Sequence, residues 1–271
     1  METMTRRKRK RNLLPVVLAV VLAVIVAALA LLVFRSLLPA AQREEPDPHA
    51  GQIYVNDGAN MVWLTPHENF AVSPLHRWQF VTLEGQPWYV GSEFAVRRGV
   101  DLSVFQKNVD WAKAAESGVE FAVIRLGFRG YGKGALQPDD LFDSHLDGAH
   151  TAGIDAGVYF FSQALTAEEG REEAQYVLER LKGRKLELPV YFDWEPISAE
   201  DSRTNGYDYA NLTDSAVAFC QTIQAAGYQA GVYINRQQGY YHYDLSRLAD
   251  YSLWVADYNA CLLYTSDAAD E

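Results

Sequence analysis

The sequence predicts an α/β domain that follows an N-terminal transmembrane helix and a small β-rich segment. Three observations support this prediction. A long apolar run stands near the N-terminus, short strand-like runs occupy residues 52–97, and from residue 98 onward apolar strand-like runs alternate with helical patterns. Strands that alternate with helices favour a parallel sheet with right-handed crossovers, either open or closed into a barrel.

The apolar run Leu13–Phe34 contains no charged residue and only one proline, Pro15. At 1.5 Å per residue a helix of this length spans roughly 33 Å, enough for a bilayer core of about 30 Å. Residues 1–12 include six consecutive basic side chains, and positive charge stays on the cytoplasmic side of a membrane. We therefore expect a single-pass anchor at the cell membrane over residues 13–34, with a cytoplasmic N-terminus and an extracellular domain. A cleaved signal peptide is the alternative, because Pro39–Ala41 is a small-residue patch that suits a cleavage site.

Charge is distributed unevenly along the chain. Residues 36–271 hold 17 of the 24 basic and 34 of the 35 acidic side chains, which gives them a formal net charge of −17. An acidic surface repels nucleic acid, so we expect no nucleic-acid partner and interpret the basic block as a topology signal.

The six histidines show no metal-ligand spacing, and there is no glycine-rich phosphate loop. We expect neither a metal nor another cofactor.

Composition divides the chain after the apolar run. Residues 35–51 are polar and contain proline, which is typical of a linker. In residues 52–97, short apolar runs separated by Glu84–Pro87 predict a small β-rich appendage. Residues 98–259 hold the alternating pattern of the main domain. The strands expected there are Val119–Leu126, Gly157–Phe161, Leu188–Phe192, Gly231–Ile234 and Leu253–Ala256, and the helices are Val109–Ser117, Leu141–Ala152, Ala167–Leu181 and Thr213–Ala226.

Two helix-to-strand junctions of the main domain are nearly identical. Ala152–Tyr159 (AGIDAGVY) and Ala226–Tyr233 (AGYQAGVY) share their alanines, glycines, valine and tyrosine at the same spacing. In each we expect the first glycine to end a helix and a short turn to lead into a strand.

Two carboxylates stand at the end of an apolar strand-like run, in the segment Pro189–Pro196 (PVYFDWEP). The strand period of two places Asp193 and Glu195 on one face, and a rise of about 3.3 Å per residue separates their Cα atoms by roughly 6–7 Å. Two acids this close cannot both ionise freely, so one pKa rises and that group can donate a proton near neutral pH. A structural pair bonded to an arginine or a helix end is the alternative. Asp101, in the segment GVDLS, is a third candidate acid at a strand end, for which a helix N-cap is the alternative.

Together these segments resemble the glycoside hydrolase family 25 lysozymes. The resemblance covers about Arg98 to Tyr258, and the family shows the motifs in the same order. They are GVDLS at Asp101, Asp110-Trp111, Ala152-Gly-Ile, GVYFF with Tyr159 and Phe161, PVYFDWE with Asp193 and Glu195, GVYIN with Tyr233 and Asn235, and LWVADY with Trp254 and Tyr258. The resemblance implies an irregular TIM-like β/α barrel. It also implies hydrolysis of peptidoglycan glycan strands at the β-1,4 bond between N-acetylmuramic acid and N-acetylglucosamine.

The resemblance further implies residue roles. Glu195 is similar to the general acid of the family, and Asp193 to the carboxylate that steadies the substrate's N-acetyl group or the developing positive charge. Asp101 is similar to the acid of the first strand. The strand-end side chains that would line the substrate groove are Arg125, Tyr159, Phe161, Tyr233, Asn235, Trp254 and Tyr258. For each of these a wall or core role is the alternative, and for Arg125 the pairing of an acid is a further one. The carboxylate spacing leaves the stereochemical course open.

The chain departs from the family after Tyr258. Family members continue with a Trp-Gln-Tyr segment and a final Asp motif, for which residues 260–271 leave no room. We therefore expect a barrel that lacks its C-terminal strands, and interpret residues 260–271 as a tail of doubtful origin. Two other functions remain open, a hydrolase of another sugar bond and a catalytically silent, membrane-anchored wall-binding protein. The acids at 101, 193 and 195 favour the muramidase, since a silent protein does not need them.

Overall fold

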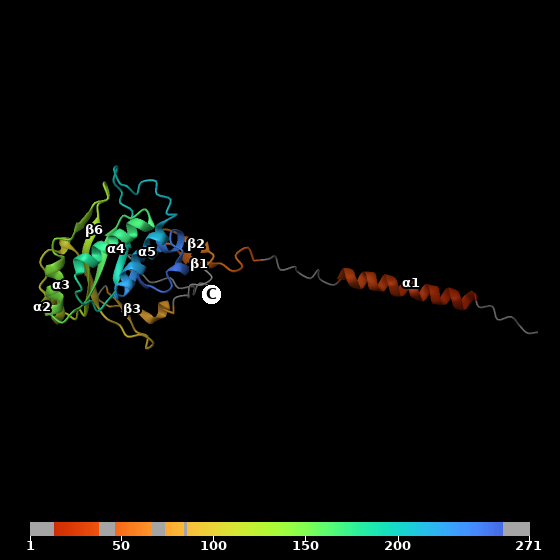
Figure 1. Ribbon diagram of the computed structural model, residues 1–271. Coiled ribbons are helices and arrows are strands. Elements are labelled where there is room, and N and C mark those ends of the chain that lie inside the picture. The colour runs from red at the N-terminus through yellow and green to blue at the C-terminus, as the bar shows by residue number, and fades with distance from the viewer. Residues whose placement is uncertain (1–13, 38–46, 67–73, 84–85, 257–271) are drawn as a thin grey trace, which may run out of the picture. The chain divides into compact units, whose positions relative to one another are not determined.

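The structure of the chain is a computed structural model (Figure 1). It describes residues 14–37, 47–66, 74–83 and 86–256. Tyr258 and the tail, residues 260–271, lie outside the described residues, as does the basic block near the N-terminus.

The first of two units, Met1–Ala50, contains the helix α1 (Leu14–Leu37) in its described part. The window Leu18–Arg35 has a mean hydropathy of 2.9, so α1 is long and apolar enough to cross a membrane. Apolar side chains surround the helix instead of forming one stripe, as in a membrane span. A signal sequence near an N-terminus meets the same criteria. The apolar helix predicted for residues 13–34 is therefore present, and its retention as an anchor stays a prediction.

The second unit, Gly51–Glu271, begins with two antiparallel hairpins. They are formed by β1 (Ile53–Asn56) with β2 (Met61–Leu64) and by β3 (Phe80–Leu83) with β4 (Gln86–Tyr89). The short strands expected over residues 52–97 thus take the form of two separate two-stranded sheets.

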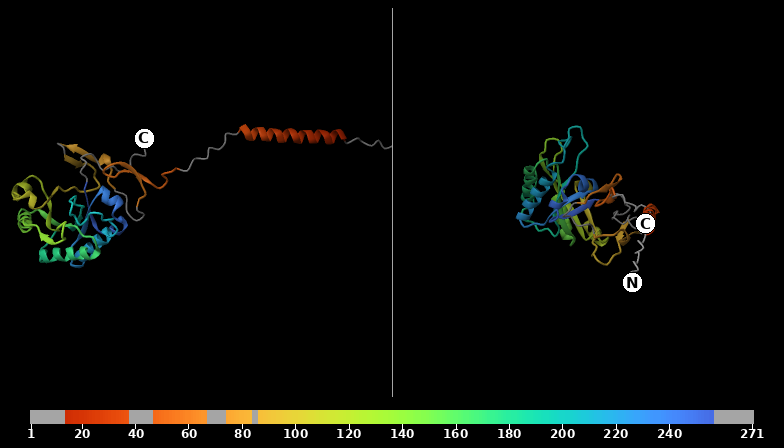
Figure 2. Two further views of the ribbon diagram at one scale, coloured as in Figure 1. Left: turned by 90° about the horizontal axis from the view of Figure 1, so that it is seen from above. Right: turned by 90° about the vertical axis from the view of Figure 1, so that its right-hand side faces the viewer.

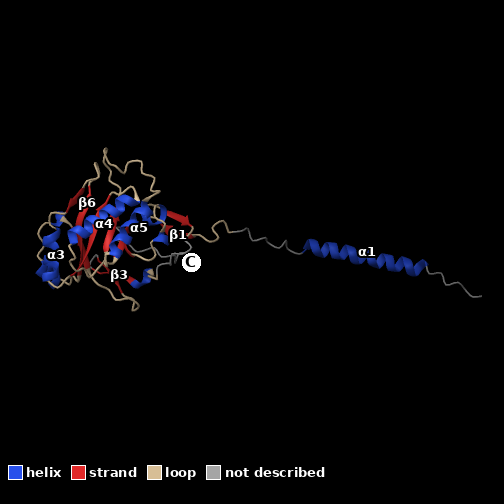
Figure 3. Cartoon of the chain, viewed as in Figure 1, coloured by secondary structure: helices blue, strands red, loops and turns tan. Residues whose placement is uncertain are grey.

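Seven strands form the main sheet of this unit (Figure 3). In sheet order they are β11 (Ser252–Ala256), β10 (Ala230–Asn235), β9 (Val190–Trp194), β8 (Asp155–Ser162), β6 (Phe121–Arg129) and β5 (Gly99–Leu102), with β7 (Leu136–Pro138) beside β6. All neighbours are parallel except β7, which is antiparallel to β6. The predicted α/β class with a parallel sheet is confirmed, and the sheet is curled (Figure 2). A barrel like that of the resembled family stays a prediction. Among the described strands the sheet is open, because its edge strands β5 and β11 do not pair with each other.

Five α-helices accompany these strands in the described part of the unit. They are α2 (Trp111–Glu116), α3 (Phe142–Thr151), α4 (Ala167–Leu181), α5 (Leu212–Ala225) and α6 (Arg236–Tyr241). The bounds of α4 coincide with the prediction, and those of α2, α3 and α5 differ from it by at most two residues. Helix α6 and strand β7 were not predicted, because six and three residues are too few to show a period.

The two repeated junctions adopt the predicted geometry. Gly153 directly follows the C-cap of α3 with φ +73°, and Gly227 follows that of α5 with φ +90°. Residues other than glycine rarely adopt such left-handed conformations, so glycine is suited to both turns. The strands that follow, β8 and β10, both pair with β9 at Asp193.

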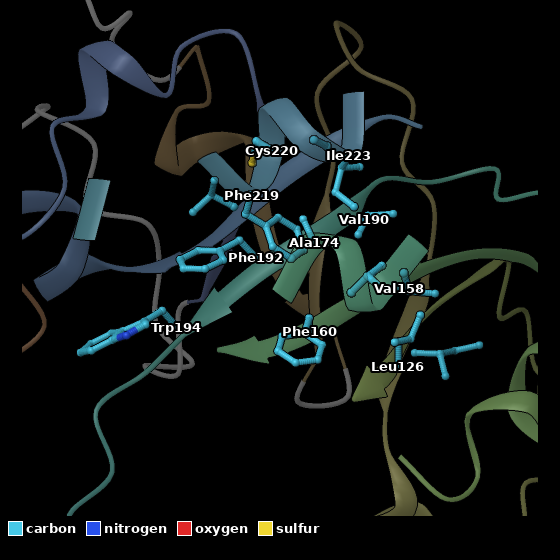
Figure 4. Close-up of a cluster of buried hydrophobic side chains, with 14 of the residues drawn as sticks. Leu126, Val158, Phe160, Ala174, Val190, Phe192, Trp194, Phe219, Cys220 and Ile223 are labelled. Carbon is cyan, nitrogen blue, oxygen red and sulfur yellow. The ribbon is translucent and has the colours of Figure 1, made fainter. Parts of the chain in front are cut away.

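The hydrophobic core lies between one face of the sheet and helices α3, α4 and α5 (Figure 4). Leu126, Phe160 and Phe192 point to this face from three strands and are fully buried. From α5, Phe219 places its ring centroid 5.4 Å from that of Phe192. Burying each large apolar side chain stabilises the fold by about 1.5–3 kcal/mol. This face of the sheet therefore serves stability and leaves the opposite face for other side chains.

The first hairpin is attached to α6 by polar contacts. The Tyr241 hydroxyl donates a 2.7 Å hydrogen bond to the carboxylate of Asp57, which is 5% exposed. The other oxygen of Asp57 accepts from the amides of Ala59 and Asn60 in the turn, each at 2.8 Å. Because one carboxylate holds both the turn and the helix, this hairpin is fixed to the end of the sheet at which β10 leads into α6.

Candidate active site

One row of predicted site residues crosses four strands on the face of the sheet opposite the helices. Phe161 of β8 is in register with Asp193 of β9, Asp193 with Tyr233 of β10, and Tyr233 with Trp254 of β11. Registered residues on parallel strands point to the same face, so these four side chains form a continuous row.

A second row lies two residues closer to the amino ends of the strands. It joins Arg125 of β6, Tyr159 of β8 and Tyr191 of β9. Asp101 of β5 is in register with Val123, two residues before Arg125, and therefore points to the same face. The structure thus brings together candidate residues from six strands near the carboxyl end of a parallel sheet, where α/β enzymes place their sites.

Asp193 is the most deeply buried of the three candidate acids, with 6% of its surface exposed. Burial raises the pKa of Asp193 well above 3.8, its ordinary value, and the charges of Glu195 and Asp101 raise it further. The charge of Arg125 opposes these effects. Atom Oδ1 of Asp193 has no hydrogen-bond partner among the described residues. Since no donor stabilises this oxygen as an anion, the carboxyl group favours its protonated form.

Glu195 follows the last residue of β9 and is half-buried. Burial raises its pKa, and a hydrogen bond with Tyr233 opposes the rise. The spacing of the Asp-x-Glu pair predicts one raised pKa, whereas both pKa values are raised in the structure. The physical reason is that each carboxyl group loses contact with water, in addition to the effect of Glu195 on the pKa of Asp193.

Trp194 separates the two acids and points to the opposite face, as the strand period predicts. It is fully buried, and its indole nitrogen donates a 2.9 Å hydrogen bond to the carbonyl of Ala164. The rings of Tyr207 and Tyr209 lie 5.7 and 5.6 Å from its ring. These contacts fix the end of β9 and with it the direction of Asp193.

Arg125 forms an ion pair with Asp139, a residue that sequence analysis did not select. Atom Nε of Arg125 lies 2.8 Å from Oδ2 of Asp139, whose side chain is fully buried. Asp139 also accepts hydrogen bonds from the backbone amides of Val104, at 2.9 Å, and Leu141, at 3.1 Å. The guanidinium lies over the rings of Phe105 and Phe128, with its central carbon 5.1 and 5.4 Å from their centroids. Asp139 therefore orients the cation that acts on Asp193, and links it to the loop after β5.

Trp254 is the centre of an aromatic wall on this face. Its ring is edge-on to those of Tyr159, Tyr191 and Tyr233, with centroids 5.7, 5.5 and 5.0 Å away. Burial raises the pKa of Tyr159 and of Tyr191, so both phenols stay neutral at physiological pH. Tyr191 was not selected from the sequence because it stands inside an apolar run, where a core residue and a site residue have the same pattern.

Two further predicted residues of the groove are Asn235 and Tyr258. The side-chain oxygen of Asn235 accepts a 2.9 Å hydrogen bond from the amide of Gln238 and caps α6. This gives Asn235 a structural role, and a role in binding substrate stays a prediction. Tyr258 lies outside the described residues, so its predicted place in the groove also stays a prediction.

The charged groups of this face suit proton transfer. Two carboxyl groups with raised pKa values stand next to a third carboxylate and a paired arginine. Carboxyl groups of this kind can hold a proton near neutral pH and transfer it to a bound substrate. Within the described ranges, no group of three or more His, Cys, Asp or Glu side chains is placed to hold a metal ion.

More than half of the chain matches one known family. The family model of the glycosyl hydrolases family 25 matches residues 100–265. The chain belongs to this family. The match includes every residue that the resemblance assigned to the family 25 site, from Asp101 to Tyr258.

Individual relatives agree with the family assignment. The autolytic lysozyme of Clostridium acetobutylicum is 26% identical over 162 residues, which cover 59% of this chain and 45% of that protein. Lysozyme M1 of Streptomyces globisporus is 30% identical over 79 residues, or 29% of this chain and 25% of that protein. The chain thus spans less than half the length of these curated relatives.

A solved structure shows the same fold. The modular autolysin LytC of Streptococcus pneumoniae superposes with a TM-score of 0.56 at 23% identity. The superposition covers 69% of this chain and 45% of that one. This likeness supports the curled α/β sheet of family 25, on which the two rows of site residues lie.

Proposed function

We propose that this family 25 chain is a muramidase, a peptidoglycan hydrolase that cleaves the β-1,4 bond between N-acetylmuramic acid and N-acetylglucosamine. The observation that carries the proposal is the group of three carboxyl groups at one end of the parallel sheet, two of them with raised pKa values. A glycosidase needs an acid that keeps its proton near neutral pH. The lysozyme relatives and the LytC structure with a synthetic peptidoglycan ligand support the same substrate class.

The exposure of Glu195, Asp193 and Asp101 suggests a different role for each acid in this proposal. Glu195 is the more exposed of the pair, so it reaches the glycosidic oxygen and protonates it as the bond breaks. Asp193 is the more buried of the pair. It interacts with the N-acetyl group of the substrate in this proposal, and the positive charge that develops there favours the ionised form of its carboxyl group. Asp101, exposed on β5, adds negative charge beside it.

Trp254 and the tyrosines around it form one wall of the substrate groove in this proposal. The rings offer apolar surface to the faces of sugar rings, and the tyrosine hydroxyl groups can bond sugar oxygens. Tyr233 combines this role with its hydrogen bond to Glu195. Arg125, which Asp139 already binds, sets the charge around Asp193 instead of meeting the glycan as a free cation.

The proposal is tested by mass spectrometry of fragments released from purified peptidoglycan by the full chain. We expect muropeptides with new reducing ends on N-acetylmuramic acid, because this is the bond that the proposal assigns. Reducing ends on N-acetylglucosamine would instead identify a hydrolase of the other glycan bond. Binding to peptidoglycan with no released fragments would identify a silent wall-binding protein.

We further propose that α1 is retained as a membrane anchor, with the basic segment in the cytoplasm and the catalytic domain outside. The anchor is supported by its length, by its mean hydropathy and by the six basic residues before it. Protease added to intact spheroplasts is then expected to remove the domain and leave a small membrane-bound stub. Recovery of a soluble domain with a new N-terminus near Ala41 would instead show that α1 is part of a cleaved signal peptide.

A further inference from the structure

We propose that Gln238 is a positioning residue for the candidate general acid Glu195, and that Gln163 is its second support. This inference rests on the proposed muramidase function. The two side chains reach the end of β9 from different elements, α6 and the loop after β8, and they donate to consecutive carbonyl groups. They are therefore suited to hold the backbone on which Glu195 stands.

Gln238 is held at both ends of its side chain. Atom Nε2 donates a 2.5 Å hydrogen bond to the carbonyl of Trp194, and Oε1 accepts from the amide of Asn235 at 3.1 Å. Only 2% of the residue is exposed. Because its two partners are an acceptor and a donor, the orientation of the amide is fixed, and neither Glu nor a hydrophobic residue satisfies both partners.

Gln163 supports the next carbonyl along the chain. Its Nε2 donates to the carbonyl of Glu195 at 2.5 Å and to that of Ser162 at 2.8 Å. Gln163 is fully buried. Both partners are acceptors, so the nitrogen must face them, and replacement of the amide leaves two carbonyl groups in the interior without this donor.

These bonds matter because the strand pairing of β9 stops before Glu195. Its ladder with β8 ends at Trp194, and its ladder with β10 ends at Asp193. Beyond these residues the sheet no longer fixes the chain. Trp194 lies at the tip of β9 (Figure 4). Gln238 holds Trp194, one residue beyond the ladder with β10, and Gln163 holds Glu195, one residue beyond the ladder with β8. Both bonds therefore fix the backbone where the carboxyl group of Glu195 must keep its distance from the glycosidic oxygen.

The test compares Gln238→Met with Gln237→Met in the full chain. Gln237 is the exposed neighbour on the same helix and provides the matched control. We expect Q238M to lower kcat on peptidoglycan by about 10- to 100-fold, the range that a misplaced catalytic group produces, with a much smaller change in KM. We also expect Q238M to leave Glu195 less buried. Because burial raises the pKa of Glu195, this pKa then falls and the alkaline limb of the pH profile moves to lower pH. Q237M is expected to match the parent.

Gln163→Met is the second variant, because Gln163 has no part in the capping of α6. The same loss of kcat and the same shift of the pH profile in Q163M would separate positioning from helix capping. A parental kcat and pH profile in either folded variant, with only a lower Tm, would overturn the inference and leave the muramidase function in place. If the parent chain itself releases no muropeptides, the proposed function fails instead.

Discussion

Replacement of Glu195 by glutamine is expected to lower the turnover of glycan strands by at least about 10²-fold. Glutamine keeps the shape and hydrogen-bonding capacity of the side chain, including an acceptor for Tyr233, but it cannot donate a proton at neutral pH. General acid assistance contributes roughly 10²–10⁴-fold to such reactions. We expect kcat to fall and KM to stay close to that of the parent, because the substitution leaves the substrate groove unchanged. The measurement is the initial rate of reducing-end formation on purified peptidoglycan.

The matched control for this variant is Glu200→Gln in the loop after β9. Glu200 is exposed, and its replacement removes the same charge without reaching the site. Its expected rate is that of the parent. A folded E195Q variant that turns over glycan at the parental rate would remove Glu195 from the mechanism and leave Asp193 as the candidate acid.

The sequence predicted those features that depend on local pattern. The alternation of apolar strands and helices is visible because each period repeats several times, and both repeated glycines stand where a helix must end. Asp193 and Glu195 could be selected as site candidates from the sequence, because charged residues at the end of an apolar strand conflict with burial. The raised pKa of each follows from that conflict.

Features that depend on long-range contact were not visible. Asp139 stands in a polar stretch that looks like an ordinary turn, and its importance comes from Arg125, which is 14 residues away. Gln163 and Gln238 have no charge and no motif, and they bond to neighbouring carbonyl groups only because β9 ends between their two elements. A single sequence contains no signal for such long-range contacts, because they depend on how strands and loops pack in three dimensions.

Replacement of Asp193 by asparagine is expected to stabilise the fold at neutral and alkaline pH while it lowers activity. The folded-state pKa of Asp193 is raised above 3.8, so the native state binds this proton more tightly than the unfolded state does. Its contribution to stability is fully present below the unfolded pKa and is lost as pH rises through the folded pKa. Above that pH the parent must bury a charge in a site where Oδ1 has no partner among the described residues, whereas asparagine stays neutral.

The expected result is therefore a difference in Tm between D193N and the parent that is small near pH 4 and grows toward pH 8. Each pKa unit of the shift corresponds to about 1.4 kcal/mol, and each kcal/mol to roughly 2–4 °C for a domain of this size. Asp250→Asn is the control, because Asp250 is exposed and its replacement leaves the pH dependence unchanged.

Activity is expected to move in the opposite direction. The side-chain amide of the D193N variant can neither accept a proton nor carry the charge that the developing positive centre needs, so kcat falls by about 10²-fold or more. Thermal unfolding across pH and kcat on peptidoglycan, measured on the same preparations, test both halves of this prediction. A variant that is less stable than the parent at pH 8 would show that the Asp193 carboxylate is stabilised in the native state, and the burial argument for its raised pKa would then be wrong. A variant that is more stable and equally active would support the burial argument but remove Asp193 from catalysis. Catalytic residues often lower the stability of the fold, so replacing one is expected to raise stability and reduce activity together.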